Sequence, residues 1–224
     1  MPSRRQVDSS YSLFPAEEPK LDAQGLSEGA RLLKAFAIPD IPELKQALRG
    51  ITKKAPFRNM VTPGGYRMSV AMTNCGQVGW ITDRSGYRYE AIDPESGKPW
   101  PPMPHCFLDL AKRAATAAGF LSFLPDGCLI NRYDPGTRLS LHQDRNEHDF
   151  RQPIVSVSLG LRAVFLWGGG KRSERPRRIR LESGDVVVWG GPARLNFHGV
   201  APLAEGTDPV FGTCRINLTF RKAL

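Results

Sequence analysis

The chain has 224 residues, a length that suits one large domain or a core with an added lobe. Hydrophobic residues make up 41% of it, enough to bury a core, and its frequent glycine and proline favour short strands over a helix bundle. No apolar run approaches the roughly 18 residues of a membrane span, and the N-terminus lacks the apolar region of a secretory signal. These features predict a soluble, cytoplasmic protein.

The charge balance is basic, with 31 Lys and Arg against 22 Asp and Glu and a net charge of +9. Such a balance favours a polyanionic partner, most often nucleic acid. The run KRSERPRRIR, 171–180, holds six of the basic residues, although charge also keeps an exposed edge strand from pairing. The four cysteines form no CxxC pair, which argues against a zinc ribbon and fits reduced, buried thiols.

In chain order, residues 1–25 are polar and rich in serine and proline, and we expect a flexible arm. The stretch 41–51 has apolar residues at helical spacing and predicts an amphipathic helix. A second helix is predicted over 106–120, with Gly119 as its stop. The side chains expected to face inward are Ile41, Leu44, Leu48 and Ile51 in the first helix, and Phe107, Leu110 or Ala111, Ala114 and Ala118 in the second.

The middle segment, 56–100, is rich in predicted strands and contains a hairpin, VGWIT and YRYEAI, around the four-residue loop DRSG. Together with the first helix it is expected to form a lobe, 26–100, over the mouth of a barrel. From residue 128 onward the sequence consists of short runs of alternating apolar and polar residues, separated by turn residues, and each run predicts a strand. The expected strands are CLINRY, RLSLHQD, IVSVSLG, AVFLWG, RIRLE, DVVVWG, LNFHGV and RINLTF. This pattern predicts a mainly β sandwich or jelly-roll core over 101–224, flanked by helices.

One predicted strand, RLSLHQD, places His142 and Asp144 on the same face. Residues two apart on a strand have Cα atoms roughly 6.6 Å apart, so both side chains can reach one metal ion. His198 lies in a later strand that could neighbour His142 across the barrel. Two histidines and a carboxylate with open positions form the facial triad of non-haem Fe(II) oxygenases, although this spacing also arises by chance. His105 is expected to be structural, and His148 to be solvated.

Polar residues also alternate along the last predicted strand, where Arg215, Asn217 and Arg221 share one face. A buried arginine needs an anion, and a guanidinium grips a carboxylate bidentately, so two of them suit a cofactor with two carboxylates. Asn131 and Tyr133, which share a face of an earlier strand, could hydrogen-bond to the same acid. The simpler alternative is that these faces are the wet side of an antiparallel sheet.

These motifs resemble the Fe(II)/2-oxoglutarate dioxygenases, and several longer stretches resemble the bacterial AlkB proteins over residues 55–224. The stretches are MVTPGGYRMSVAMTNCG, GYRYEAIDP, CLINRYDPG, LSLHQD, PIVSVSLGL, GDVVVWGG and CRINLTFR. The resemblance implies a double-stranded β-helix (jelly-roll) core with an N-terminal nucleotide-recognition lid. It also implies Fe(II), 2-oxoglutarate and O2 as reactants, and oxidative removal of N-methyl groups as formaldehyde. The expected substrates are 1-methyladenine and 3-methylcytosine in single-stranded or locally opened DNA, with RNA a second candidate.

Carried over by position, the resemblance assigns a role to each matching residue. The iron ligands would be His142, Asp144 and His198, and the 2-oxoglutarate pocket would contain Asn131, Tyr133, Arg215, Asn217 and Arg221. Substrate contacts would come from Trp80, Tyr87, Arg88, Tyr89, Asn146 and Arg172. Asn146 departs from the family pattern, because the bacterial proteins carry an aspartate there. Phosphate contacts are expected from Lys171, Arg172, Arg175, Arg177 and Arg178, with Lys53 and Lys54 as further candidates.

Three other interpretations stay open. One is a zinc- or iron-dependent cupin-like enzyme that needs no 2-oxoglutarate. Another is an Fe(II)/2-oxoglutarate hydroxylase of a protein or small molecule, which the basic lid disfavours. The third is a non-catalytic nucleic-acid binder on a degenerate barrel, which the intact triad disfavours. A monomer is expected in each case.

Overall fold

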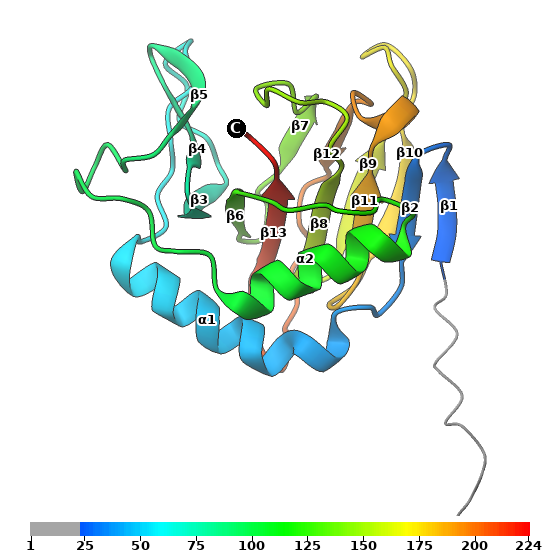
Figure 1. Cartoon of the computed structure of the whole chain (residues 1–224), viewed down its shortest axis with the longest axis horizontal. Coiled ribbons are helices and arrows are strands. Elements are labelled where there is room, and N and C mark those ends of the chain that lie inside the picture. The colour runs from blue at the N-terminus through cyan, green and yellow to red at the C-terminus, as the bar shows by residue number, and fades with distance from the viewer. Residues whose placement is uncertain (1–22) are drawn as a thin grey trace, which may run out of the picture.

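The computed structural model describes residues 23–224, which form two antiparallel sheets packed face to face, a separate hairpin and two long helices (Figure 1). The larger sheet has the strand order β1-β2-β11-β8-β13-β6-β3, and the smaller has the order β10-β9-β12-β7. The larger sheet contains β1 (Ala23–Ser27), β2 (Ala30–Leu33), β3 (Ala71–Gly76), β6 (Gly127–Tyr133), β8 (Ile154–Gly160), β11 (Val186–Trp189) and β13 (Arg215–Arg221). The smaller sheet contains β7 (Leu139–His142), β9 (Ala163–Trp167), β10 (Arg177–Leu181) and β12 (His198–Val200).

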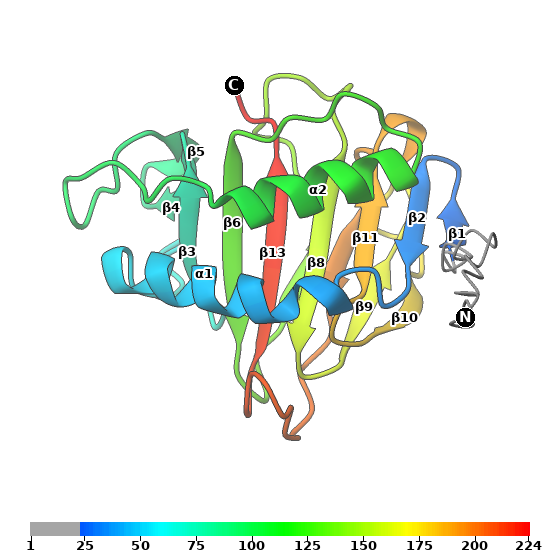
Figure 2. The same cartoon turned by 60° about the horizontal axis from the view of Figure 1, so that its bottom comes forward.

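Two helices, α1 (Ile41–Lys54) and α2 (His105–Ala117), lie side by side across the outer face of the larger sheet (Figure 2). The four inward side chains predicted for α1 are its buried residues, and the predicted inward face of α2 is buried too. The second helix ends at Ala117, just before Gly119, whose φ of 93° suits a glycine that terminates a helix. Both predicted helices are thus confirmed.

The central strand β13 shows why both faces of the larger sheet are buried. Ile216, Leu218 and Phe220 point into the apolar cluster beneath the helices. Their alternating neighbours, including Arg215 and Arg221, point to the opposite side and are equally buried. The wet-face alternative from the sequence is therefore wrong here, because the smaller sheet covers that polar face. Polar side chains held inside a sandwich need partners, and this need defines the site.

The N-terminal part of the described chain differs from the prediction. Residues 1–22 of the predicted flexible arm, 1–25, lie outside the described residues, and the last three residues of the arm begin β1. Strand β2 pairs with β11, so the N-terminus extends the larger sheet. Strand β3, from the predicted lobe 26–100, pairs with β6 at the other edge of that sheet. Strands β1, β2 and β3, which precede residue 100, therefore belong to the same sheet as β6, β8, β11 and β13, which follow residue 100.

The lid hairpin consists of β4 (Gly79–Asp83) and β5 (Gly86–Glu90) and forms a sheet of its own (Figure 1). The predicted four-residue loop is wrong, because Asp83 pairs with Gly86 and leaves a two-residue connection. Gly86 has a φ of 130°, a conformation that favours glycine and lets the chain turn this tightly.

The remaining sequence predictions concern cysteines and membrane spans. Cys75 and Cys128 are buried and Cys106 and Cys214 half-buried, and none of these four forms a disulfide. Within residues 23–224 there is no helix with the length and hydrophobicity that a membrane crossing requires.

Candidate metal and cofactor site

A cavity of about 760 Å³ lies between the two sheets, next to the lid hairpin. Its walls come from the polar face of β13, from β6, from β7 and β12 of the smaller sheet, and from the hairpin. Trp189 forms part of the wall and is almost fully buried, so it belongs to both the core and the cavity wall.

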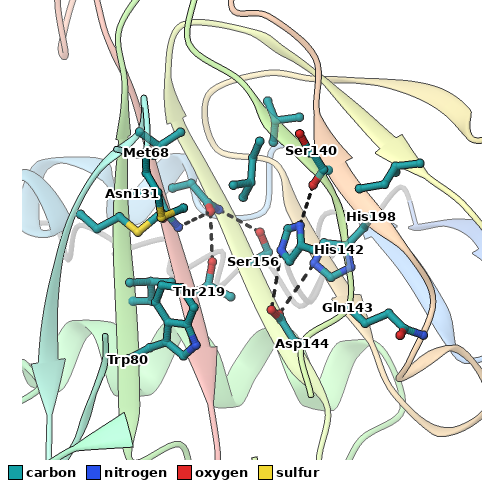
Figure 3. Close-up of a pocket in the computed structure, with 18 of the residues that line it drawn as sticks. Met68, Trp80, Asn131, Ser140, His142, Gln143, Asp144, Ser156, His198 and Thr219 are labelled. Carbon is teal, nitrogen blue, oxygen red and sulfur yellow. Dashed lines mark hydrogen bonds and ion pairs between the residues drawn. The ribbon is translucent and has the colours of Figure 1, made fainter. Parts of the chain in front are cut away.

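Three of the predicted residues meet on one side of this cavity, as Figure 3 shows. His142 ends β7 and pairs directly with His198 of β12, because β12 is inserted between β9 and β7. Asp144 follows two residues beyond the end of β7. Its carboxylate oxygens lie 3.7 Å from the Nε2 atom of each histidine. One potential ligand atom from each of the three residues lies within 4.8 Å of the other two, a separation that one metal ion could bridge.

Hydrogen bonds to the backbone orient both imidazole rings. The Nδ1 atom of His142 lies 2.9 Å from the carbonyl oxygen of Ser140, and that of His198 lies 3.1 Å from the carbonyl oxygen of Asn196. A carbonyl oxygen only accepts, so each Nδ1 carries the hydrogen and each Nε2 presents a lone pair. This arrangement is the one that fixes metal-binding histidines in other proteins.

The third member of the triad, Asp144, is held ionised. Burial raises its pKa, but Arg221, together with the neighbouring His198 and His142, lowers the pKa by more, so the result lies well below the usual range. Arg221 donates to the same Oδ2 atom through Nη2 at 2.8 Å and through Nε at 3.2 Å. Burial and the neighbouring His142 lower the pKa of His198 to about 4. An ionised Asp144 beside a neutral His198 imidazole is the protonation state in which these two side chains can bind a divalent metal.

The low pKa of His198 predicts an acid-sensitive metal-free protein. The folded pKa is about 4 and the usual value is 6.5, so between these pH values the unfolded chain binds more protons. The free energy of unfolding should therefore fall as the pH drops from 6.5 towards 4, by on the order of 3 kcal/mol. Urea unfolding at stepped pH, with metal removed, measures this slope. His198→Asn should flatten the slope, and His148→Asn, a change at an exposed histidine, should leave it as in the wild type.

The other end of the cavity holds the predicted cofactor residues. Arg215 stacks over the ring of Tyr133, with 4.9 Å from its Cζ atom to the ring centroid, and donates to Ser158 Oγ at 2.9 Å. Asn131 donates to Asn217 Oδ1 at 3.1 Å across the β6–β13 pair. The four predicted residues Asn131, Tyr133, Arg215 and Asn217 are almost fully buried and line the cavity.

Several buried hydrogen-bond donors in this cavity have no protein partner. Within residues 23–224 they include Nε and Nη1 of Arg215 and Nη1 of Arg221. A buried guanidinium N–H without an acceptor costs free energy, which a bound anion would recover. The donors belong to Arg215 and Arg221, which both lie on β13 and line the same cavity. Arg221 is also the partner of Asp144. The residues present therefore fit a small dicarboxylate beside a divalent metal.

Comparison with known proteins agrees with this geometry. Residues 29–221 match the 2OG-Fe(II) oxygenase superfamily. The chain is 56% identical over 211 residues to the alpha-ketoglutarate-dependent dioxygenase AlkB of Escherichia coli (strain K12), covering 94% of this chain and 97% of that protein. The chain belongs to the AlkB family. It is therefore an Fe(II)/2-oxoglutarate-dependent dioxygenase, and the predicted cofactors Fe(II) and 2-oxoglutarate, with O2 as co-substrate, are confirmed.

Two more distant relatives extend the comparison. The chain is 34% identical over 133 residues to the tRNA demethylase abh1 of Schizosaccharomyces pombe, covering 58% of this chain and 43% of that protein. The structure of OsALKBH1 superposes with a TM-score of 0.78 at 29% identity, covering 89% of this chain and 99% of that one. This superposition confirms the predicted jelly-roll core.

At the cavity mouth of this AlkB protein, the lid presents aromatic side chains. Trp80 and Tyr87 stack with ring centroids 5.7 Å apart and 22° between their planes. Trp80 Nε1 donates to Asn146 Oδ1 at 3.2 Å, so the residue that departs from the family pattern lies at the mouth and holds the indole. Arg172 also lines the cavity and lies over the ring of Phe197. These four predicted substrate residues are brought together.

The structure places the other two predicted substrate residues, Arg88 and Tyr89, outside the cavity lining. Arg88 is opposite Ile81 in the hairpin, on the face away from Trp80, and pairs with Asp83 and Glu90. Tyr89 shares the face of Trp80 but donates to the Glu147 carboxylate at 2.5 Å. Strand alternation alone separates Arg88 from its two tyrosine neighbours.

Two buried residues of the site, Glu147 and Arg194, are not predicted from the sequence. Their ion pair of 3.0 Å is almost fully enclosed. Arg194 also donates to the backbone oxygens of Asp144 and Gln152 and so braces the loop between β7 and β8. Glu147 follows Asp144 by three residues, which was a usable signal, but nothing local indicates that a glutamate in a charged loop is buried.

Proposed function

We propose that this AlkB family chain oxidatively removes N-linked methyl groups from bases of the 1-methyladenine and 3-methylcytosine type, foremost in DNA and also in RNA. The observation that carries this proposal is the placement of the iron triad in a cavity whose mouth holds the stacked Trp80–Tyr87 pair. The cavity volume of about 760 Å³ leaves room for both a dicarboxylate and a base. The tRNA demethylase among the relatives supports the RNA component.

A base inside a duplex cannot reach such a cavity, so the target must leave the stack. A methylated Watson–Crick edge pairs poorly, which lowers the cost of extrusion. The Trp80 indole offers the extruded base a stacking surface worth roughly 1–3 kcal/mol. Bound iron and 2-oxoglutarate supply, with O2, the oxidation of the methyl carbon. The chain orients the base, positions the cofactor through its arginines and excludes bulk water.

The basic run supplies phosphate contacts on the rim. Arg172 lines the cavity, and the exposed arginines of β10, Arg177 and Arg178, continue from the same connection. Lys53 and Lys54 lie instead beside a separate depression near Trp100, which makes them contacts for more distant phosphates at most. Contacts of this kind carry no base specificity, and binding should weaken with salt.

A formaldehyde assay tests the proposal. Single-stranded oligonucleotides carrying 3-methylcytosine should yield formaldehyde only when Fe(II), 2-oxoglutarate and O2 are all present, and His142→Ala should yield none. Formaldehyde formed without 2-oxoglutarate would indicate the cupin-like alternative. Consumption of 2-oxoglutarate without formaldehyde release from any methylated oligonucleotide would indicate a hydroxylase of another substrate. Binding of the oligonucleotide with neither reaction would indicate a non-catalytic binder.

We further propose that the protein acts as a monomer in the cytoplasm. Four thiols without disulfides in residues 23–224 suit a reducing compartment. Light scattering of the purified protein measures the oligomeric state directly.

The Asn146→Asp variant tests the substrate end of the site. An aspartate can still accept from Trp80 Nε1, and it adds a negative charge beside a base that is cationic in both proposed lesions. A hydrogen bond to a charged group contributes about 1 kcal/mol more free energy than a hydrogen bond between neutral groups. We therefore expect KM for 3-methylcytosine oligonucleotides to fall roughly 5-fold, with kcat little changed. The measurement is steady-state formaldehyde release.

The neutral lesion 1-methylguanine provides the internal comparison and should show no such gain. Gln77→Glu adds the same charge at an exposed position outside the cavity and controls for net charge. An equal KM for Asn146→Asp and the wild type on both lesions would show that the amide and the carboxylate are equivalent here.

A further inference from the structure

A buried carboxylate connects the lid, the cofactor end and the metal end of the site. Glu147 lies in the loop between β7 and β8, and its side chain is 2% exposed. Its Oε1 atom accepts from Tyr89 Oη and lies 3.4 Å from Arg221 Nε, and its Oε2 atom accepts from Arg194. Nothing in the oxidation itself uses this carboxylate, yet it contacts three elements that meet at the cavity.

The contact with Arg221 determines how that guanidinium is oriented. Its Nη2 and Nε atoms both donate to Asp144 Oδ2, and Nε also lies 3.4 Å from Glu147 Oε1. The remaining nitrogen, Nη1, is buried and has no partner in the described part of the chain. Because both carboxylates lie at the Nε–Nη2 edge, the planar guanidinium cannot rotate without lengthening these ion pairs, and Nη1 stays available for an anion in the cavity.

The contact with Tyr89 reaches the lid. Tyr89 lies directly opposite Trp80 in the β4–β5 pair, on the face where Trp80 stacks with Tyr87. Within the described chain, the side-chain hydrogen bonds from this hairpin to the loop after β7 are those of Tyr89 to Glu147 and of Trp80 to Asn146. The first of these is buried and charge-assisted, which makes it the stronger of the two.

We propose that Glu147 is a positioning residue, which orients Arg221 for 2-oxoglutarate and, through Tyr89, anchors the lid hairpin to the same arginine. The inference deepens the proposed function, because it rests on the role of Arg221 in holding 2-oxoglutarate. It predicts two effects that separate experimentally. Loss of the Glu147 charge weakens both cofactor binding and the lid, whereas loss of the Tyr89 hydroxyl weakens the lid alone.

Hydrogen exchange of residues 79–90 in the metal-free, cofactor-free protein tests the anchor. A buried hydrogen bond to a charged acceptor is worth roughly 1.5–3 kcal/mol, so Tyr89→Phe should accelerate exchange about 10-fold or more. Tyr87→Phe makes the same chemical change on the same face of β5 without a contact to Glu147, and its exchange should match the wild type. Exchange of β8 should be unchanged in both variants, which verifies an intact fold. If residues 79–90 of Tyr89→Phe exchange at the wild-type rate, the proposal that Tyr89 anchors the lid is wrong.

Calorimetric binding of 2-oxoglutarate to the Mn(II) form tests the positioning role. Glu147→Gln should weaken binding about 10-fold or more, as loss of supporting contacts does at metal sites, and Tyr89→Phe should stay within about twofold of the wild type. Unchanged affinity in Glu147→Gln would overturn this role. A wild-type protein that binds no 2-oxoglutarate would overturn the proposed function and the cofactor half of the inference, while the exchange experiment would still decide the lid half.

Discussion

Replacing Arg215 by methionine should abolish 2-oxoglutarate binding without destabilising the metal-free protein. Arg215 is 2% exposed, and two of its nitrogens have no partner among residues 23–224. Two hydrogen bonds to a charged acceptor, each worth roughly 1.5–3 kcal/mol, correspond to a loss of at least about 100-fold in cofactor affinity. Removing an uncompensated buried charge costs the folded protein little, so the free energy of unfolding should stay within about 1 kcal/mol of the wild type or exceed it.

The matched control is Arg221→Met, because the two arginines lie on the same face of β13. Arg221 is paired with Asp144 and Glu147 in the protein itself. Its loss leaves two buried carboxylates, and the metal-free protein should lose about 3–5 kcal/mol. Chemical unfolding and calorimetric 2-oxoglutarate titration measure both quantities. Equal destabilisation by the two substitutions would mean that Arg215 is held for structural reasons and not for an anion.

The Asp144→Asn variant should lose metal binding and turnover together. The substitution keeps the shape of the side chain but removes the charge that faces both histidines and Arg221. Loss of supporting groups already costs about 10–100-fold in metal affinity, so loss of a proposed ligand should cost at least about 100-fold. The thermal stabilisation that Mn(II) gives the wild type should disappear, and formaldehyde release should fall to background.

The metal-free Asp144→Asn protein should also be less stable by roughly 3 kcal/mol, because Arg221 loses its nearest counterion. Asp149→Asn is the control from the same loop. Within residues 23–224, Asp149 forms an ion pair only with Arg151, whose side chain is 90% exposed, so this change should have little effect on stability and leave metal binding intact. If Mn(II) still stabilises the Asp144→Asn variant, Asp144 is not a metal ligand.

Local patterns predicted those parts of the molecule where periodicity carries the information. The alternation of β13 separates core residues such as Leu218 from cavity residues such as Asn217, and the same rule applied to β5 would have turned Arg88 away from the cavity. The helical spacing of α1 placed its buried face correctly. These predictions succeed because side-chain direction follows directly from backbone geometry.

Other features depended on tertiary structure. The sequence identified His142, Asp144 and His198 as candidates, but the insertion of β12 between β9 and β7 is what sets the two histidines opposite each other. Whether the polar face of β13 is wet or enclosed depends on the second sheet, and the burial of Glu147 depends on Tyr89, Arg194 and Arg221 arriving from three distant segments. Strand order and burial are set by long-range pairing, in which each residue's environment comes from parts of the chain that its neighbours in sequence do not specify.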